Sequence, residues 1–227
     1  MGESLCPIAE AHFEKAPYSL SVNGIGDLFA VYSGAYMLTA LPVGFLVDCA
    51  CAWRGGEPRI AGRLLKLMMS CGALGAAVSL VLLGPIATLV SSEAALPLAA
   101  VGLAGLGTST AFWIIPSLPD MNLGIAEDDE ASRNAVASGW TGVYSGGGGA
   151  GAVLGSLIYA RNGFDSLCYV MLVGAAATWA AMLAWLVSSS QRWPARPRGP
   201  LMPASTTRVA TEPLLHVNVC GPQSPGS

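Results

Sequence analysis

Few side chains of this 227-residue chain have the types and spacing that covalent or metal chemistry requires. The only two histidines, His12 and His216, lie near opposite ends of the sequence, where we expect both to be solvated. Cys49 and Cys51 form the one close cysteine pair; we interpret it as inert, with S-palmitoylation as the alternative. No disulfide framework, zinc-site spacing or nucleophile motif is present. The sequence therefore predicts a protein that is not an enzyme and holds no metal or other cofactor.

The composition narrows the class of protein further. Apolar residues make up 53% of the chain and charged residues only 11%, whereas soluble domains carry about 25% charged residues. The net charge is −3 with eleven basic residues, which leaves no basic face for phosphates. These values exclude an ordinary soluble enzyme, a nucleic-acid-binding protein and a disordered chain.

Five runs without any charged residue indicate how the apolar residues are used. The runs are 20 to 27 residues long, and a transmembrane helix needs about 20. They are too long for barrel strands and are apolar on all sides. We therefore predict an all-α, polytopic membrane helix bundle in the lipid bilayer, with five transmembrane helices at 28–48, 64–84, 95–116, 137–159 and 167–188.

The basic residues predict the orientation of these spans. Nine of the eleven fall in the loops and tail on one side of the bundle, and only Lys15 and Arg161 fall on the other. By the positive-inside rule the C-terminus is cytosolic, with 189–227 as a disordered cytosolic tail. Residues 1–27 then form an outer or lumenal loop, and no secretory signal is evident in them. An odd number of spans with a hydrophilic outer head suggests a missing upstream part.

Small residues dominate the fourth span. Glycines with a spacing of four residues can let a neighbouring helix approach closely. The four consecutive glycines at 146–149 could instead bend or unwind the helix, and both interpretations stay open. The residues assigned to helix packing are Gly142, Gly146, Gly147, Gly151 and Gly155.

The segment from Gly44 to Asp48, followed by Arg54, Arg59 and Arg63, resembles the signature loop of the major facilitator superfamily. More specifically, the chain resembles the C-terminal half of vesicular amine or polyamine transporters. The similar stretches are Ala35–Asp48, Leu83–Pro85, Ile114–Asp120, Ser138–Gly139 and Tyr159–Phe164. The resemblance implies that the five helices correspond to the eighth through twelfth helices of a twelve-helix fold. It also implies a missing N-terminal transporter half as a partner.

The resemblance further implies a role for two acids at helix ends. Asp48 and Asp120 would gate the cytosolic side by pairing with Arg54, Arg59 or Arg133. The alternative is that both acids are simply solvated.

The function implied is transport of a small organic solute, an amine or another organic cation, by alternating access and in the manner of a secondary active antiporter. No acid lies in the middle of a span to act as a counter-ion. Aromatic rings could hold the cation instead, with ordinary packing as the alternative role. The substrate-cavity candidates are Tyr32, Tyr36, Trp113, Trp140 and Tyr144.

A second hypothesis treats the chain as a truncated membrane protein that does not transport. Five helices without a partner half cannot enclose a central site from both sides. The family resemblance implies a vesicular, endolysosomal or plasma membrane.

Overall fold

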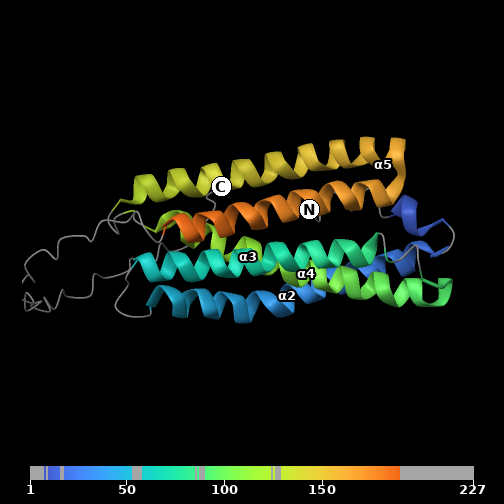
Figure 1. The fold of residues 1–227 in the computed structure, drawn as a ribbon, viewed down its shortest axis with the longest axis horizontal. Coiled ribbons are helices and arrows are strands. Elements are labelled where there is room, and N and C mark those ends of the chain that lie inside the picture. The colour runs from blue at the N-terminus through green and yellow to red at the C-terminus, as the bar shows by residue number, and fades with distance from the viewer. Residues whose placement is uncertain are drawn as a thin grey trace, which may run out of the picture. The chain divides into compact units, whose positions relative to one another are not determined.

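A computed structural model gives the fold of the chain. It describes residues 8, 10–15, 18–52, 58–84, 86, 90–123, 125 and 129–189. This described part is helical and contains no strand, as the all-α prediction requires. The long helices are α2 (Val22–Ala52), α3 (Pro58–Leu83), α4 (Ser92–Asn122) and α5 (Glu130–Ser189) (Figure 1).

The chain divides into a compact unit of residues 1–192 and a second unit of residues 193–227. The second unit lies outside the described residues, as does nearly all of the predicted tail at 189–227. The fold below is therefore that of the first unit.

Helix α5 consists of two helices joined at Gly163, and Figure 1 shows the chain folding back at this hinge. The backbone of Gly163 has φ 82° and ψ −179°, a conformation that only glycine adopts without strain. We call residues 130–162 the first arm and residues 164–189 the second arm. The described part thus contains five helical segments in the places of the five predicted spans.

All four helices are long and apolar enough to cross a membrane. They extend beyond the predicted spans at most ends, because a charge-free run marks only the stretch suited to hydrocarbon. The backbone can continue as a helix into the headgroup region. Helix α4 continues past residue 116, the predicted end of the third span, and contains Pro116 and Pro119 before it ends at Asn122. A proline removes one backbone donor, but a membrane helix tolerates this loss.

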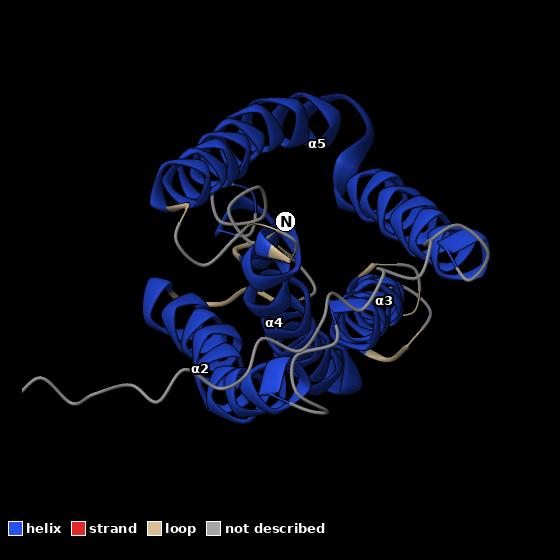
Figure 2. Cartoon of the chain, turned by 90° about the vertical axis from the view of Figure 1, so that its left-hand side faces the viewer, coloured by secondary structure: helices blue, strands red, loops and turns tan. Residues whose placement is uncertain are grey.

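Helix α4 packs against both α2 and α3, and Figure 2 shows it inside the bundle. Glycines permit this close packing. A Cβ atom on Gly72 of α3 would lie 2.8 Å from the carbonyl oxygen of Ser109 of α4. A Cβ atom on Gly107 of α4 would collide with the backbone carbonyl of Tyr32 of α2. Both positions need a residue without a side chain.

Buried apolar residues form two clusters at different ends of the helices. The hinge-end cluster lies where α5 folds back, and it contains Ile25, Leu28, Leu83, Leu103, Phe164 and Leu167. The Lys66-end cluster lies where α2 ends and α3 begins, and it contains Val43, Val47, Ala50 and Leu65.

Residues that precede α2 belong to the hinge-end cluster. Ile8 and Phe13 are each only 2% exposed, and both pack in this cluster. The described part of the predicted outer loop, residues 1–27, therefore packs on the helices, and the side of the membrane on which it lies stays a prediction. Residues 22–27 also belong to α2.

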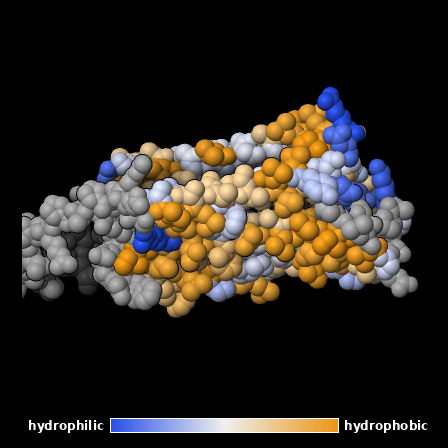
Figure 3. Space-filling model, viewed as in Figure 1, coloured by the Kyte–Doolittle hydropathy of each residue, from blue (hydrophilic) through white to orange (hydrophobic). Residues whose placement is uncertain are grey.

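Large apolar side chains cover much of the helix surface. Leu38 and Leu41 of α2 are 78% and 79% exposed, and Val143 of α5 is 79% exposed. The space-filling view shows apolar surface along the helices, with strongly hydrophilic groups gathered toward the ends (Figure 3). A soluble monomer rarely exposes so continuous an apolar surface, whereas lipid covers it without cost.

Candidate functional site

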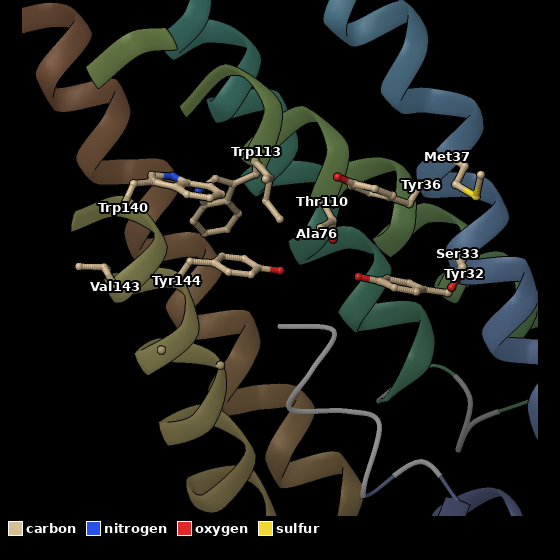
Figure 4. A pocket seen from close by; sticks show the side chains of 13 residues that line it. Tyr32, Ser33, Tyr36, Met37, Ala76, Thr110, Trp113, Trp140, Val143 and Tyr144 are labelled. Atoms are coloured by element: carbon tan, nitrogen blue, oxygen red, sulfur yellow. The ribbon is translucent and has the colours of Figure 1, made fainter. Parts of the chain in front are cut away.

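A pocket of about 820 Å³ lies among α2, α3, α4 and the first arm of α5. This volume is in the range of small-molecule sites, which is about 300–1,000 Å³. The pocket is lined by all five aromatic residues singled out from the sequence: Tyr32, Tyr36, Trp113, Trp140 and Tyr144 (Figure 4). The structure thus brings the five rings together, and their contact with a substrate stays a prediction.

Helical periodicity explains why each helix contributes several lining residues. On α2, Tyr32 and Tyr36 are four residues apart and share one face. On the first arm of α5, Trp140 and Tyr144 have the same spacing. The smaller lining residues were not among the predicted ones, and the same periodicity would have found all of them except Ala76 of α3. They are Ser33, Met37, Ala76, Thr110, Ile114, Val143, Gly147 and Gly148.

Trp140 and Tyr144 form a flat aromatic wall. Their ring centroids are 5.4 Å apart and their planes differ by only 5°. The indole N–H of Trp140 donates a hydrogen bond to Ser117 Oγ at 2.9 Å, and the Ser117 hydroxyl donates to the carbonyl of Ile114 at 2.6 Å. Ser117 of α4 thereby fixes the plane of Trp140. The sequence analysis did not identify this serine, since nothing in the spacing links it to a tryptophan 23 residues away.

Hydroxyl groups on α2 and α4 hold the opposite side of the pocket. Thr39 Oγ1 donates to Thr108 Oγ1 at 3.3 Å and joins the two helices close to the lining residues. Thr110 Oγ1 donates to the carbonyl of Leu106 at 2.7 Å. The Thr39–Thr108 contact joins α2 to α4 about one turn from Tyr36, whereas the Thr110 bond lies within α4.

The pocket lining contains no formally charged side chain. Asp27 and Asp48 lie near the two ends of α2, and Asp165 lies just after the hinge. A cation in this pocket would therefore rest on ring faces and hydroxyl oxygens, without a carboxylate. Among the described residues, no group of three or more His, Cys, Asp or Glu side chains could hold a metal ion.

Asp120 pairs with a different residue from those that the sequence analysis named. Its Oδ2 accepts a charged hydrogen bond from Lys66 Nζ, a residue that was not among the predicted partners Arg54, Arg59 and Arg133. Lys66 lies in the third turn of α3, beside the end of α4, so it is the basic residue within reach. The Lys66 ammonium also lies over the ring of Trp185, 4.8 Å from its centroid. Three helical segments, α3, α4 and the second arm of α5, thus meet at Lys66.

The remaining signature-loop residues are not assembled into a gate in this structure. Asp48 and Arg63 are exposed. A Cβ atom on Gly44 would meet no atom within 4 Å, so no other described helix closely approaches this residue. Arg54 and the side chain of Arg59 lie outside the described residues.

Three of the five glycines assigned to helix packing have no close neighbour within this chain, and their packing role stays a prediction. A Cβ atom on Gly142, Gly146 or Gly147 would meet no atom within 4 Å. Gly151 is half-buried and Gly155 is buried. Small residues indicate that a close approach is possible, but not which helix makes it. In this chain the close approaches involve glycines of α3 and α4 instead.

His12 is not solvated, contrary to expectation. Its ring stacks on Phe164 with centroids 3.8 Å apart and planes 10° apart. Burial lowers the pKa of His12 to about 4, an effect that Lys15 strengthens and Asp165 opposes. No sequence pattern indicates this contact, because the two rings are far apart along the chain.

No protein-family model, curated protein or solved structure matches this chain. Its function therefore has to be argued from the residues and their geometry.

Proposed function

We propose that this chain moves a small organic cation across a membrane by alternating access, as the C-terminal half of a major facilitator transporter. The observation that carries the proposal is the convergence of five aromatic side chains on one uncharged pocket. Each ring face contributes about 0.5–2 kcal/mol to binding a desolvated cation. The family assignment rests on the resemblance of Gly44–Asp48 and the arginines that follow.

The position of the pocket supports transport over a structural role for the aromatic residues. Tyr36 lies near the middle of α2, and Thr110 lies near the middle of α4. Tyr144 lies near the middle of the first arm of α5. A substrate site near the middle of membrane-length helices is what an alternating-access carrier requires.

Exposed side chains beside the pocket support the proposal of a second half. Met37 lines the pocket and is nevertheless 68% exposed, and Val143 lines it and is 79% exposed. The pocket is therefore incomplete on the side where α2 and the first arm of α5 face outward. An N-terminal half would supply the missing wall.

The charge distribution supports an orientation. Lys66, Arg63 and Arg133 belong to the end of the bundle where α3 and α5 begin. With the C-terminal arginines they make this the cytosolic end. The hinge end, with Lys15 and Arg161, would then face a lumen or the outside.

Binding and uptake test the proposal separately. The full chain is reconstituted in lipid, and binding of tetraethylammonium, a monoamine and a polyamine is followed by tryptophan fluorescence. Uptake of the same cations into proteoliposomes is measured with and without a pH gradient. Trp140→Leu removes part of the aromatic wall, and Trp179→Leu is the control, since Trp179 lies on the second arm and does not line the pocket.

We expect Trp140→Leu to weaken cation binding by about 2- to 30-fold and Trp179→Leu to leave it unchanged. Uptake requires both halves, so saturable binding without uptake by the full-length protein would favour the second hypothesis, a membrane protein that does not transport. No saturable binding of any of the three cations would contradict the proposed function.

A further inference from the structure

Residues that precede α2 form a short structured segment, which we call the head (residues 8–20). Its described residues are 8, 10–15 and 18–20. Ile8 and Phe13 are buried in the hinge-end cluster, together with Phe164, Leu167 and Cys168 of α5. Tyr18 and Leu20 pack against the same cluster. The head is thus held on the hinge of α5 by side chains from both of its ends.

His12 is the centre of the aromatic contacts that hold the head. Its ring stacks on Phe164, the residue directly after the hinge glycine Gly163. Phe13 lies edge-on to His12 at 5.2 Å between centroids, and Tyr18 lies at 5.5 Å. Lys15 Nζ also lies over the ring of Tyr159, one turn before the hinge, at 5.6 Å from its centroid. The head therefore contacts α5 on both sides of the hinge.

The hinge-end cluster, on which the head packs, lies at one end of the aromatic pocket. On α2 the cluster residues Ile25 and Leu28 come before the pocket residues 32–37. On α4 the cluster residues 99–106 come before the pocket residues 110–114. On α5 the pocket residues 140–148 come before the cluster residues 158–168. The cluster thus lies on the hinge side of the pocket on each of these helices, and the two meet at Tyr32 and Ala76.

The groups around His12 make its packing sensitive to charge. Burial is the main reason that the pKa of His12 falls from 6.5 to about 4. The nearby charges are Asp165 of α5, which favours the protonated ring, and Lys15 of the head, which opposes it. Tyr18 is neutral, since burial raises the pKa of its hydroxyl. The residues that α2, α3 and α4 bring to the cluster are apolar: Ile25, Leu28, Ala76, Leu83, Ala99, Leu103 and Leu106.

The direction of the pH effect follows from this pKa. Docking of the head lowers the pKa of His12. The neutral His12 ring therefore favours the docked head fully above pH 6.5. It loses this contribution as the pH falls from 6.5 toward 4 and the ring takes a proton from solvent. A charged imidazolium stacked among Phe164, Phe13 and Tyr18 would lack the water that it needs.

We propose that the head is a plug that closes the hinge end of the aromatic pocket at neutral pH, and that protonation of His12 releases it. The opening of a solute pathway by this release rests on the proposed function. Release of the head on protonation of His12 does not depend on the proposed function. The device would respond to the pH on the hinge side of the membrane.

Hydrogen–deuterium exchange of the full chain in lipid nanodiscs tests the plug directly. Exchange of residues 8–20 and of the hinge is compared at about pH 7.5 and about pH 4.5, with labelling times scaled for intrinsic exchange. The His12→Phe variant keeps an aromatic ring on Phe164 but cannot be protonated. The His216→Phe variant is the matched control, since His216 is the only other histidine.

We expect acid to raise scaled exchange of the head by about tenfold or more in the wild type and in His216→Phe. The His12→Phe variant should stay protected at both pH values. Equal scaled exchange of the wild-type head at both pH values would overturn the proposal. An acid-induced rise that persists in His12→Phe would overturn it as well, because His12 would then not be the switch.

A second measurement links the plug to the pocket. The association rate of tetraethylammonium, followed by stopped-flow tryptophan quenching, should rise in acid for the wild type and not for His12→Phe. A chain that binds no cation at any pH would contradict the proposed function and leave the exchange result standing. A chain that binds cations while its head stays protected in acid would contradict the plug alone.

Discussion

Lys66 of α3 and Asp120 of α4 form an ion pair at the end of the bundle opposite the hinge. Their side chains are 20% and 12% exposed, so water screens the pair only partly. The Lys66-end cluster packs beside this ion pair. Leu65, next to Lys66, belongs to the cluster, and Leu123 packs against it. Along the helices, the aromatic pocket thus lies between two different groups of contacts. An ion pair and an apolar cluster lie at one end, and the aromatic head lies at the other.

The ion pair predicts a specific loss of stability. Lys66→Met leaves the Asp120 carboxylate partly buried without its partner, and should lower the free energy of unfolding by about 1–3 kcal/mol. The double variant Lys66→Met/Asp120→Leu should lose less than the sum of the two single changes, because it leaves no unpaired charge. Denaturant unfolding of the chain in detergent measures both effects.

Arg63→Met is the control for this prediction. Arg63 lies on the same helix, three residues before Lys66, but its side chain is exposed. Its replacement should change stability by less than about 0.5 kcal/mol. If Lys66→Met were no more destabilising than Arg63→Met, the ion pair would contribute nothing measurable.

Ser117 should position Trp140 in the pocket. Ser117→Ala removes the acceptor for the indole N–H, and should weaken cation binding by about 2- to 10-fold, corresponding to the loss of one hydrogen bond. The emission of Trp140 should also shift, since its N–H loses a partner. Ser117→Thr keeps the hydroxyl and should restore both properties. Ser156→Ala is the control, because Ser156 is exposed and bonds only to the carbonyl of Ala152 on its own helix. An equal effect of the two alanine changes would contradict the role of Ser117.

The sequence predicted the helices well, because helix length and the sharing of one face by residues such as Tyr32 and Tyr36 depend on local periodicity. Charge-free runs mark membrane-length segments, and residues four positions apart share a face wherever a helix forms. The positions of the aspartate and glutamate residues near helix ends follow from the same charge-free runs. These features need no knowledge of which helix packs against which.

The features that the sequence did not predict depend on contacts between distant segments. His12 and Phe164 are separated by most of the chain, and no pattern connects them. Glycine spacing at Gly142 and Gly146 is as suggestive as the glycines of α3 and α4, yet only the latter are in contact with another helix. The hinge at Gly163 was expected only as a loop between spans, and its position depends on the left-handed backbone of one residue.

Asp129 should hold the first turn of α5. Its carboxylate accepts a hydrogen bond from the backbone N–H of Ser132 at 3.0 Å, in the manner of a helix cap. Hydrogen bonds from the Ser132 side chain and backbone lower the pKa of Asp129 below its usual 3.8. The cap should therefore persist above pH 3.8 and be lost only as the pH falls through the lowered value.

Asp129→Ala should therefore speed amide exchange of residues 130–133 at neutral pH, while Asp129→Asn should largely preserve their protection. Hydrogen exchange of the full chain measures the difference. Equal protection in the alanine variant and the wild type would show that the first turn does not depend on this cap.

Two glycine-to-alanine changes test which glycines carry the helix packing. Gly72→Ala places a methyl group 2.8 Å from the Ser109 carbonyl oxygen and 3.0 Å from the Trp113 backbone nitrogen. Backbone atoms cannot move aside as a side-chain end can, so α3 and α4 must separate. We expect a loss of about 1–3 kcal/mol in the free energy of unfolding. Because Trp113 lines the pocket, cation binding should weaken as well.

Gly142→Ala is the matched control, since its methyl group would meet no atom within 4 Å. This change should be neutral or stabilise the first arm of α5 by up to about 1 kcal/mol, the difference in helix propensity between alanine and glycine. The opposite ranking, with Gly142→Ala the more damaging change, would have a definite meaning. It would show that the exposed glycine face is occupied in the membrane, as the proposed second half of the transporter requires.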